Sequence, residues 1–407
     1  MGSPGQRHDG SGPVIPRREV DDLQAEWQLS HAVIEKDYVL GWLLAGIASH
    51  PSLSEWVFKG GTCLRKCYFE TYRFSEDLDF TVAGGAVLSV AFLQQTFSDV
   101  AAWVLERSGL QLTVGDSSFR ERRNKRGNPT FEGRIAFRGP LEQPGTPKVK
   151  LDITADELLT DRPAVRSVLH PYSDAMGDEG AIGAIACYSL VELMAEKLRA
   201  LAERCRPRDL YDIVHTHRHP ELLGQASDVS RALAEKARFV GIEPPTLAST
   251  RATPFRSEIE QEWANMLGHQ LPELPPFDHF WDELDEVFAW LDGSVAVPIL
   301  PRAELASVAV TPWTPPRSMV TWRTGAPLEL IRFAGANRLL VNLDYMPLEG
   351  RSGPRQVEPY ALRRSKAGDL LLFVVNDRGQ LRSYRVDRIV GASVTRESFQ
   401  PRHLVEF

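Results

Sequence analysis

The sequence predicts an α+β protein in which a mixed α/β domain is followed by a helical extension and a small all-β domain. Three observations support this prediction. A strand, a glycine turn, a helix and a second strand follow one another from residue 56 to 82. Apolar residues recur at helical spacing from 188 to about 292, and strand-like runs fill the last ninety residues. At 407 residues the chain is also too long for one ordinary core.

The composition is that of a globular protein, with 43% hydrophobic and 25% charged residues. The most apolar window, 38–48, is too short to span a bilayer and no signal peptide precedes it, so a cytoplasmic protein without a membrane partner is expected. Cysteines stand at Cys63, Cys67, Cys187 and Cys205. Cys63 and Cys67 are four residues apart and share a helix face, but zinc would need two more ligands. Buried thiols in a reducing compartment are therefore the favoured interpretation.

The elements of the first half follow from periodicity and turn residues. Residues 1–19, rich in Gly, Ser and Pro, predict a disordered lead, and 20–50 predict helix. A strand at 56–58, a helix at 62–68, a strand at 75–82 and a helix at 87–107 come next. Strands are then expected at 110–114, 130–137 and 147–152. A loop between the first two carries Arg120, Arg122, Arg123, Lys125 and Arg126.

The second half begins with helices at 188–205 and from Pro207 onward. We place a catalytic-type domain at 20–225, a helical extension at 226–297, an extended proline-rich linker at 298–316 and the all-β domain at 317–407. The all-β domain carries strand-like runs at 338–345, 356–362, 370–376, 381–386 and 391–396.

One group of residues indicates a phosphate and metal site. Gly60 and Gly61 allow a tight backbone approach, and the helix that begins near Thr62 offers free N–H groups to an anion. Asp77 and Asp79 alternate with Leu78 and Phe80, so both carboxylates project from one face of their strand. Two such carboxylates beside a phosphate site are typical Mg²⁺ ligands.

These motifs resemble the AbiEii/AbiGii family, the abortive-infection, type IV toxin–antitoxin nucleotidyltransferases of the DNA polymerase β superfamily. The resemblance covers roughly residues 20 to 225. It rests on the glycine turn, on Arg73-Phe74-Ser75-Glu76-Asp77-Leu78-Asp79, on Asp152, and on the run from Glu196-Lys197 to Arg208-Asp209-Leu210-Tyr211-Asp212. Glu35-Lys36-Asp37-Tyr38 fits the lead-in helix of the family.

The resemblance implies a polymerase-β-type fold and transfer of a nucleotide from an NTP with Mg²⁺ or Mn²⁺. Asp77, Asp79 and Asp152 would hold the metal, and Asp152 would help to deprotonate the attacking hydroxyl. Gly60, Gly61, Thr62 and Arg73 would contact the NTP, and Lys197 its phosphates. Asp209 would complete the site or orient Lys197. Arg208 and Asp212 are expected to form only surface ion pairs.

The acceptor that the family implies is RNA, such as the 3′ end of tRNA, and an antitoxin is the implied protein partner. Arg122, Arg123, Lys125 and Arg126 could hold an RNA backbone. Two alternatives stay open. One is nucleotidylation of a partner protein, of the AMPylation type, since it needs the same metal site. The other is a non-catalytic nucleotide-sensing regulator. The sequence shows no recognisable helix-turn-helix, which counts against this alternative.

The last domain differs from the rest in charge. From Arg317 onward there are 15 Lys and Arg but 9 Asp and Glu, against a net charge of −7 for the chain. The segments 344–345, 355–362, 371–377 and 381–389 resemble a WYL domain, a small Sm-like β-barrel, although the naming Trp-Tyr-Leu positions read Leu371-Leu372-Phe373. The resemblance implies that a nucleotide or nucleic acid binds Arg355, Arg382, Arg385 and Arg388 and that this domain regulates the enzyme.

Overall fold

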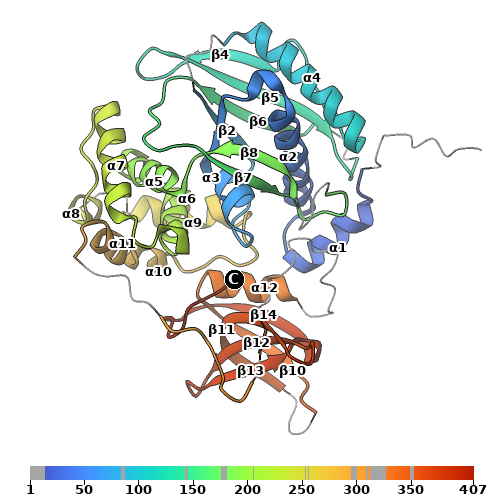
Figure 1. The fold of residues 1–407 in the computed structure, drawn as a ribbon, viewed down its shortest axis with the longest axis vertical. Coiled ribbons are helices and arrows are strands. Elements are labelled where there is room, and N and C mark those ends of the chain that lie inside the picture. Colours follow the sequence, from blue (N-terminus) through green and yellow to red (C-terminus); the bar gives the residue numbers. More distant parts are fainter. Residues whose placement is uncertain are drawn as a thin grey trace, which may run out of the picture.

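A computed structural model gives the fold of the chain (Figure 1). It describes residues 14–83, 88–142, 145–175, 181–204, 206–252, 254, 256–294, 300–308, 310–311, 327–348 and 353–407. Most of the predicted lead, Cys205 and much of the predicted linker lie outside these ranges. The lead is shorter than expected, because helix α1 begins at Arg17 and the side chain of Ile15 is buried.

The first domain is built on an eight-stranded mixed sheet with the order β3-β5-β6-β2-β1-β8-β7, with β4 paired to β5. Its strands are β1 Trp56–Lys59, β2 Asp77–Val82, β3 Gln111–Thr113, β4 Phe119–Arg123, β5 Pro129–Arg138, β6 Lys148–Thr154, β7 Ala164–Leu169 and β8 Ala181–Cys187. Strand β2 lies between β1, to which it is antiparallel, and β6, to which it is parallel. The central position of β2 fixes the two carboxylates of Asp77 and Asp79 inside the sheet rather than at its edge.

Helices cover this sheet and continue into the extension. They are α1 Arg17–Trp27, α2 His31–Ser49, α3 Gly60–Cys63, α4 Val90–Ser108, α5 Leu190–Arg204, α6 Pro207–His217, α7 Ala226–Val240, α8 Leu247–Arg251, α9 Arg256–Leu267, α10 Phe277–Asp282 and α11 Leu284–Leu291. Ser89 caps α4 and Gly109 ends it in the left-handed conformation. The predicted helix at 62–68 is present, but it begins at Gly60 and changes to a π-helix, η2, over Leu64–Tyr68.

The C-terminal domain is a six-stranded antiparallel sheet with one helix packed on it. Its elements are β9 Val310–Thr311, α12 Leu328–Ala336, β10 Leu339–Tyr345, β11 Gly353–Ser365, β12 Leu370–Asn376, β13 Leu381–Arg385 and β14 Ile389–Ser398. Figure 1 shows α12 between this sheet and the first domain. The helix α12 was not predicted, because its nine residues form a short apolar run that periodicity does not separate from a strand.

Two predictions need correction. The basic segment expected to be a loop is largely strand β4, since residues 119–123 pair with β5 and only the turn around Asn124 to Asn128 connects the two strands. The described part of the predicted linker, 300–308 with 310–311, packs on the C-terminal sheet. Ala303 is buried there, and Val310–Thr311 pairs with Arg364 and Ser365. Among the described helices, none combines the length and hydrophobicity needed to cross a bilayer.

Candidate active site

The three candidate metal ligands share one face of the sheet. The parallel register places Asp79 opposite Asp152 and Asp77 opposite Lys150. Leu78, Phe80 and Leu151 alternate with them and are fully buried beneath. Neighbouring strands lie about 4.8 Å apart, so these carboxylates are neighbours across a strand boundary. Among the described residues, the oxygen atoms of the three carboxylates do not form one tight cluster. Asp152 is bound by Lys150, with an Nζ–Oδ2 distance of 2.5 Å.

The pKa values of Asp79 and Asp77 are raised on this crowded, negatively charged face of the sheet. Burial, with Asp152 and Asp77 as like-charged neighbours, raises the pKa of Asp79 to about 6, although Lys59 opposes the shift. Burial likewise raises the pKa of Asp77. Carboxyl groups held in this way are more stable when a cation lies among them.

The glycine turn lies directly against these carboxylates. Gly60 has a φ of +83°, and a Cβ at this position would lie 2.4 Å from Oδ2 of Asp79. A Cβ on Gly61 would lie 2.3 Å from a guanidinium nitrogen of Arg73. Gly60 is therefore required both for its backbone conformation and for space, and Gly61 is required for space. The Thr62 hydroxyl donates to the carbonyl of Asp77 at 2.5 Å, so it ties the turn to β2 instead of pointing outward.

Lys197 is brought to the site from helix α5 and is buried. Its Nζ lies 2.7 Å from Oδ2 of Asp212 and 3.2 Å from Oδ1 of Asp209. Burial opposes the charge of Lys197, but Asp212 and Asp209 outweigh it and raise the pKa of the ammonium group. Lys197 therefore stays protonated at neutral pH. Asp209 also accepts from Arg204 of the same α5 helix, at 2.9 Å.

The expectation that Asp212 forms only a surface ion pair is wrong. Asp212 is fully buried and accepts from Nε and Nη2 of Arg73 at 2.6 and 2.7 Å. It also accepts from the hydroxyl of Tyr72 at 2.5 Å. Arg73 is itself 2% exposed, and its third nitrogen donates to Gln270 at 3.1 Å. The structure thus places Arg73 behind the glycine turn, where it supports Gly61.

Arg208 is half-buried rather than a surface residue, so its expected surface ion pair is also corrected. Its charge interacts with Asp77 and Glu76, and burial together with Arg73 lowers its pKa.

The sequence analysis did not identify Lys59, which lies opposite Asp79 in β1 and binds Glu157. Lys150 could have been found from period-two alternation, because it lies two residues before Asp152 on the same strand face. Lys59 could have been found because it directly precedes the glycine turn.

The basic hairpin is partly neutralised within the protein. Arg120, Arg122 and Arg134 all bind Glu132, and Arg126 binds Asp156 while its guanidinium stacks on the ring of Phe239 at 3.8 Å. Arg123 donates to the carbonyl of Gly127, and Lys125 is exposed. The hairpin turn borders a cavity of about 300 Å³ between β6 and the helices α5 and α7. Thr154, two residues after Asp152 on the same strand face, lines this cavity.

Three of the four C-terminal arginines share neighbours, since Arg355 and Arg385 both interact with Tyr345, and Asp387 binds Arg385 and interacts with Arg388. Arg355 stacks on the rings of Tyr345 and Tyr384, at 5.3 and 5.5 Å. Arg385 binds Asp369 and Asp387, and Arg382 donates to Gln380. Arg388 lies half-buried in the turn after β13.

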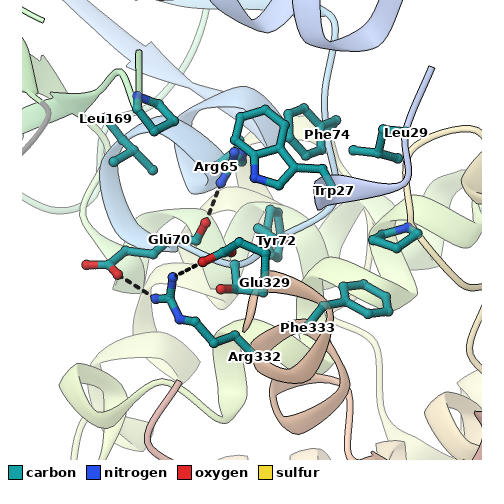
Figure 2. A pocket seen from close by; sticks show the side chains of 13 residues that line it. Trp27, Leu29, Arg65, Glu70, Tyr72, Phe74, Leu169, Glu329, Arg332 and Phe333 are labelled. Carbon is teal, nitrogen blue, oxygen red and sulfur yellow. Dashed lines mark hydrogen bonds and ion pairs between the residues drawn. The ribbon is translucent and has the colours of Figure 1, made fainter. Parts of the chain in front are cut away.

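Helix α12 docks the C-terminal domain on the elements that form the site. Arg332 binds Glu70, between the glycine-turn helix and β2, at 2.6 Å. Asn337 accepts from Tyr211 at 3.0 Å and contacts His215 at 3.1 Å, both on α6, the helix that carries Asp209 and Asp212. Figure 2 shows a pocket at this junction, in which Trp27, Tyr72 and Phe74 of the first domain face Arg332 and Phe333 of α12.

Comparison with known families decides the class of the protein. The family model for the nucleotidyl transferase AbiEii toxin of type IV toxin–antitoxin systems matches residues 42–289, more than half of the chain. The chain belongs to the AbiEii family. It is therefore an NTP-dependent nucleotidyltransferase of the toxin class, and the predicted α+β fold is confirmed. A second model, for the WYL domain, matches residues 327–394, as the C-terminal motifs predicted.

Solved structures resemble the AbiEii-family chain more distantly. MenT4, a nucleotidyltransferase toxin from Mycobacterium tuberculosis H37Rv, is 20% identical over 68% of this chain and 87% of its own, with a TM-score of 0.46. The proteasome accessory factor B/C (PafBC) of Arthrobacter aurescens is 17% identical over 52% of this chain and 32% of its own, with a TM-score of 0.18. The search of curated proteins gives no match.

Proposed function

We propose that this AbiEii-family chain transfers a nucleotide from an NTP to RNA, most simply to a tRNA 3′ end, with Mg²⁺ as its cation. The observation that carries the proposal is the parallel register that places Asp79 opposite Asp152, with the glycine turn packed on Asp79. A hydroxyl that attacks an α-phosphate needs carboxylates, a phosphate-binding turn and a positively charged side chain close together. Asp79 and Asp152, the glycine turn, and Lys197 would supply them.

The donor set fits a hard divalent cation. Asp77, Asp79 and Asp152 offer only oxygen, and burial raises the pKa of Asp77 and Asp79, so a bound cation would relieve repulsion. These three residues would hold Mg²⁺ or Mn²⁺. When bound, the cation stabilises negative charge on the attacking and leaving oxygens of the transfer. The carboxylates need not touch one another, because they would share the cations between them.

The remaining residues bind and orient. The backbone N–H groups at Gly60 and Gly61, at the start of α3, would bind the triphosphate. Lys197, kept charged by Asp212 and Asp209, neutralises the leaving pyrophosphate. Arg208, half-buried beside Asp77, adds a guanidinium for phosphate. Asp152 accepts the proton of the attacking hydroxyl and releases Lys150 as it does so.

An RNA acceptor is supported by the hairpin that borders the cavity next to β6. Arg123, Lys125 and Arg126 lie at its turn, and the stacked pair of Arg126 and Phe239 forms a flat wall of the kind that bases pack on. The partner protein implied by a type IV toxin–antitoxin family is a cognate antitoxin. Regulation of transfer by the WYL domain is supported by the contacts of Arg332 with Glu70, before β2, and of Asn337 with Tyr211 on α6.

The test is transfer of label from each of the four α-labelled NTPs to total RNA in the presence of Mg²⁺. Label in a tRNA-sized band that disappears with Asp77→Ala supports the proposal. An exposed carboxylate variant, Asp387→Ala, is the matched control and should retain transfer. No labelled RNA, or equal label from Asp77→Ala, contradicts it. Label that migrates with a protein instead would replace the RNA acceptor by a protein side chain.

A further inference from the structure

Three cysteines that are far apart in the sequence meet at one point of the fold. Cys63 lies in α3, Cys67 one turn later in η2, and Cys187 at the end of β8. Their Sγ atoms all lie within 4.8 Å of one another. Within the described residues, this is the one group of at least three potential ligands that is so close. Sequence reasoning had set zinc aside for want of two further ligands, and the fold supplies one of them.

The spacing suits metal ligation. With a metal–sulfur bond of about 2.3 Å, two thiolates on a tetrahedral ion are about 3.8 Å apart. The three sulfurs therefore need to approach by about 1 Å at most to share one ion. An all-sulfur set selects soft, thiophilic cations, in contrast to the oxygen-only set of Asp77, Asp79 and Asp152.

The local backbone supports a built site rather than chance packing of small apolar side chains. Between Cys63 and Cys67 the helix changes to π geometry, and the N–H of Phe69 bonds the carbonyl of Leu64, five residues back, at 2.9 Å. Such single π turns are rare and are frequent at functional sites. Cys187 is fixed independently, because it pairs with Phe58 across the parallel strands β1 and β8.

The surroundings offer both access and neutralising charge. Cys63 and Cys187 are buried, whereas Cys67 is half-buried and gives a cation a way in. The hydroxyl of Tyr68 lies 3.7 Å from Sγ of Cys187, and the guanidinium of Arg166 stacks on the Tyr68 ring at 4.8 Å. A cation that binds these sulfurs displaces the thiol protons, so the cluster itself becomes the charged ligand set on metal binding.

We propose that Cys63, Cys67 and Cys187 bind one thiophilic cation of the zinc group through three thiolates, with an exchangeable fourth ligand on the Cys67 side. The site is distinct from the carboxylates proposed for Mg²⁺ and does not depend on the nucleotidyl acceptor. Because Cys63 lies in the helix that Gly60 opens and Cys187 lies in β8, a bound ion would clamp the glycine turn to the sheet.

The test uses the full chain with Cys205→Ser, which leaves only the three clustered thiols, purified with a non-thiol reductant. Cd²⁺ is titrated while the thiolate-to-cadmium charge-transfer band is recorded, and metal content after expression is measured by mass spectrometry. We expect one Cd²⁺ per chain. Cys67→Ser, at the half-buried position, should weaken binding about tenfold or more and remove about one third of the band.

Cys187→Ser should weaken binding in the same way, and far-ultraviolet circular dichroism of both variants shows whether they are folded. Ser173→Ala, a serine removed from the cluster and bonded to Glu19, is the control and should leave the band unchanged. The proposal is overturned if no charge-transfer band forms. It is equally overturned if the folded Cys67→Ser protein binds Cd²⁺ as the parent does, or if two of the three thiols are found as a disulfide that excludes the ion.

Discussion

At the scale of single residues, Asp212 is the acceptor on which the cations of the site depend. Arg73, Lys197 and Tyr72 all donate to it, and none of these side chains is exposed to a substantial degree. A buried carboxylate of this kind contributes little as an isolated pair, but its removal leaves uncompensated charge. Its pKa is lowered because Arg73 and Lys197 outweigh the cost of burial.

We therefore predict that Asp212→Asn lowers the free energy of unfolding by about 3–5 kcal/mol, the usual cost of breaking a buried pair from one side. Urea denaturation at neutral pH measures it. Asp285→Asn removes an exposed partner of Arg251 and should change stability by less than about 1 kcal/mol. Equal effects of the two substitutions would contradict the buried role of Asp212.

For Asp79 we expect the opposite of the result for Asp212, namely that neutralising the side chain stabilises the metal-free protein. Its pKa is raised from 3.8 to about 6 by burial and by Asp152 and Asp77. A carboxyl group with a raised folded pKa contributes stability that is present below pH 3.8 and is lost as the pH rises through about 6. At pH 8 the ionised side chain therefore destabilises the metal-free protein.

Asp79→Asn should consequently raise the melting temperature of the metal-free protein at pH 8 while it abolishes nucleotidyl transfer. The gain should shrink as the pH is lowered toward 4, which differential scanning calorimetry across this range measures. Asp369→Asn, in the C-terminal domain, serves as the control. A lower melting temperature for Asp79→Asn at pH 8 would show that pairing with Lys59 outweighs the repulsion.

At the scale of elements, the sequence predicted the strands and helices whose patterns are local. The glycine turn, β2 and β12 were found because alternation and turn residues mark them. Strand β4 was taken for a loop because four of its five residues are charged and exposed, and only its pairing with β5 makes it a strand. Strand β7 is an edge strand, and its Val165 is 73% exposed, so it shows no core-facing pattern.

The candidate site could be predicted only in part for the same reason. Asp77, Asp79, Asp152 and Lys197 were named from strand alternation and from family motifs. The burial of Asp212 and the meeting of Cys187 with Cys63 depend on contacts between residues more than a hundred positions apart. No periodicity in one sequence records such contacts.

The β4–β5 hairpin gives a prediction for the proposed acceptor. Arg123→Ala with Lys125→Ala should raise KM for RNA about tenfold and leave KM for the NTP unchanged, because the hairpin turn borders the cavity but does not touch the glycine turn. The loss should shrink as salt is raised, since the lost contacts are electrostatic. Steady-state kinetics at two salt concentrations measures this. Arg18→Ala, a cation on α1, is the control, and an effect confined to KM for the NTP would contradict the assignment.

The junction of α6 with α12 should be sensitive to acid. Burial lowers the pKa of His215 to about 3 and those of His217 and His279 to about 4, near the charges of Arg218, Glu283 and Arg338. A histidine with a depressed pKa contributes stability above its unfolded value of 6.5, and this stability is lost as the pH falls toward the folded pKa.

The free energy of unfolding should therefore fall between pH 6.5 and 4, and His215→Gln should flatten part of this slope. Urea midpoints at three pH values measure it, with the exposed His31→Gln as the control. Slopes that are the same for His215→Gln and the parent protein would exclude His215 as a source of acid sensitivity.

At the scale of the whole molecule, the basic C-terminal domain forms ion pairs with the acidic first part of the chain. The excess of basic residues after Arg317 suggested a polyanion partner, but some of these cations bind the acidic body. Arg332 binds Glu70, Arg338 binds Glu283 and Arg396 binds Glu273. The charge asymmetry therefore helps to dock the WYL domain on the acidic first part of the chain.

The docked geometry offers a continuous route from the WYL domain to the site. Helix α12 contacts Glu70 and helix α6, Tyr72 lies in the pocket beside α12, and its hydroxyl reaches the carboxylate that holds Lys197 (Figure 2). Removal of the whole domain would expose the apolar face of this junction, so point substitutions in the full chain are the better probe.

We predict that Asn337→Ala, on the WYL side, and Tyr72→Phe, on the catalytic side, change kcat in the same direction by about 1 kcal/mol of coupling, or roughly fivefold. Asn337→Ala removes the contacts with Tyr211 and His215, and Tyr72→Phe removes only the bond to Asp212. Arg378→Ala, exposed in the turn after β12, should have no effect. If both variants keep the melting temperature and the kcat of the parent protein, the WYL domain is not coupled to the active site through α12. Loss of the contacts at either end of this path would then have left transfer unchanged.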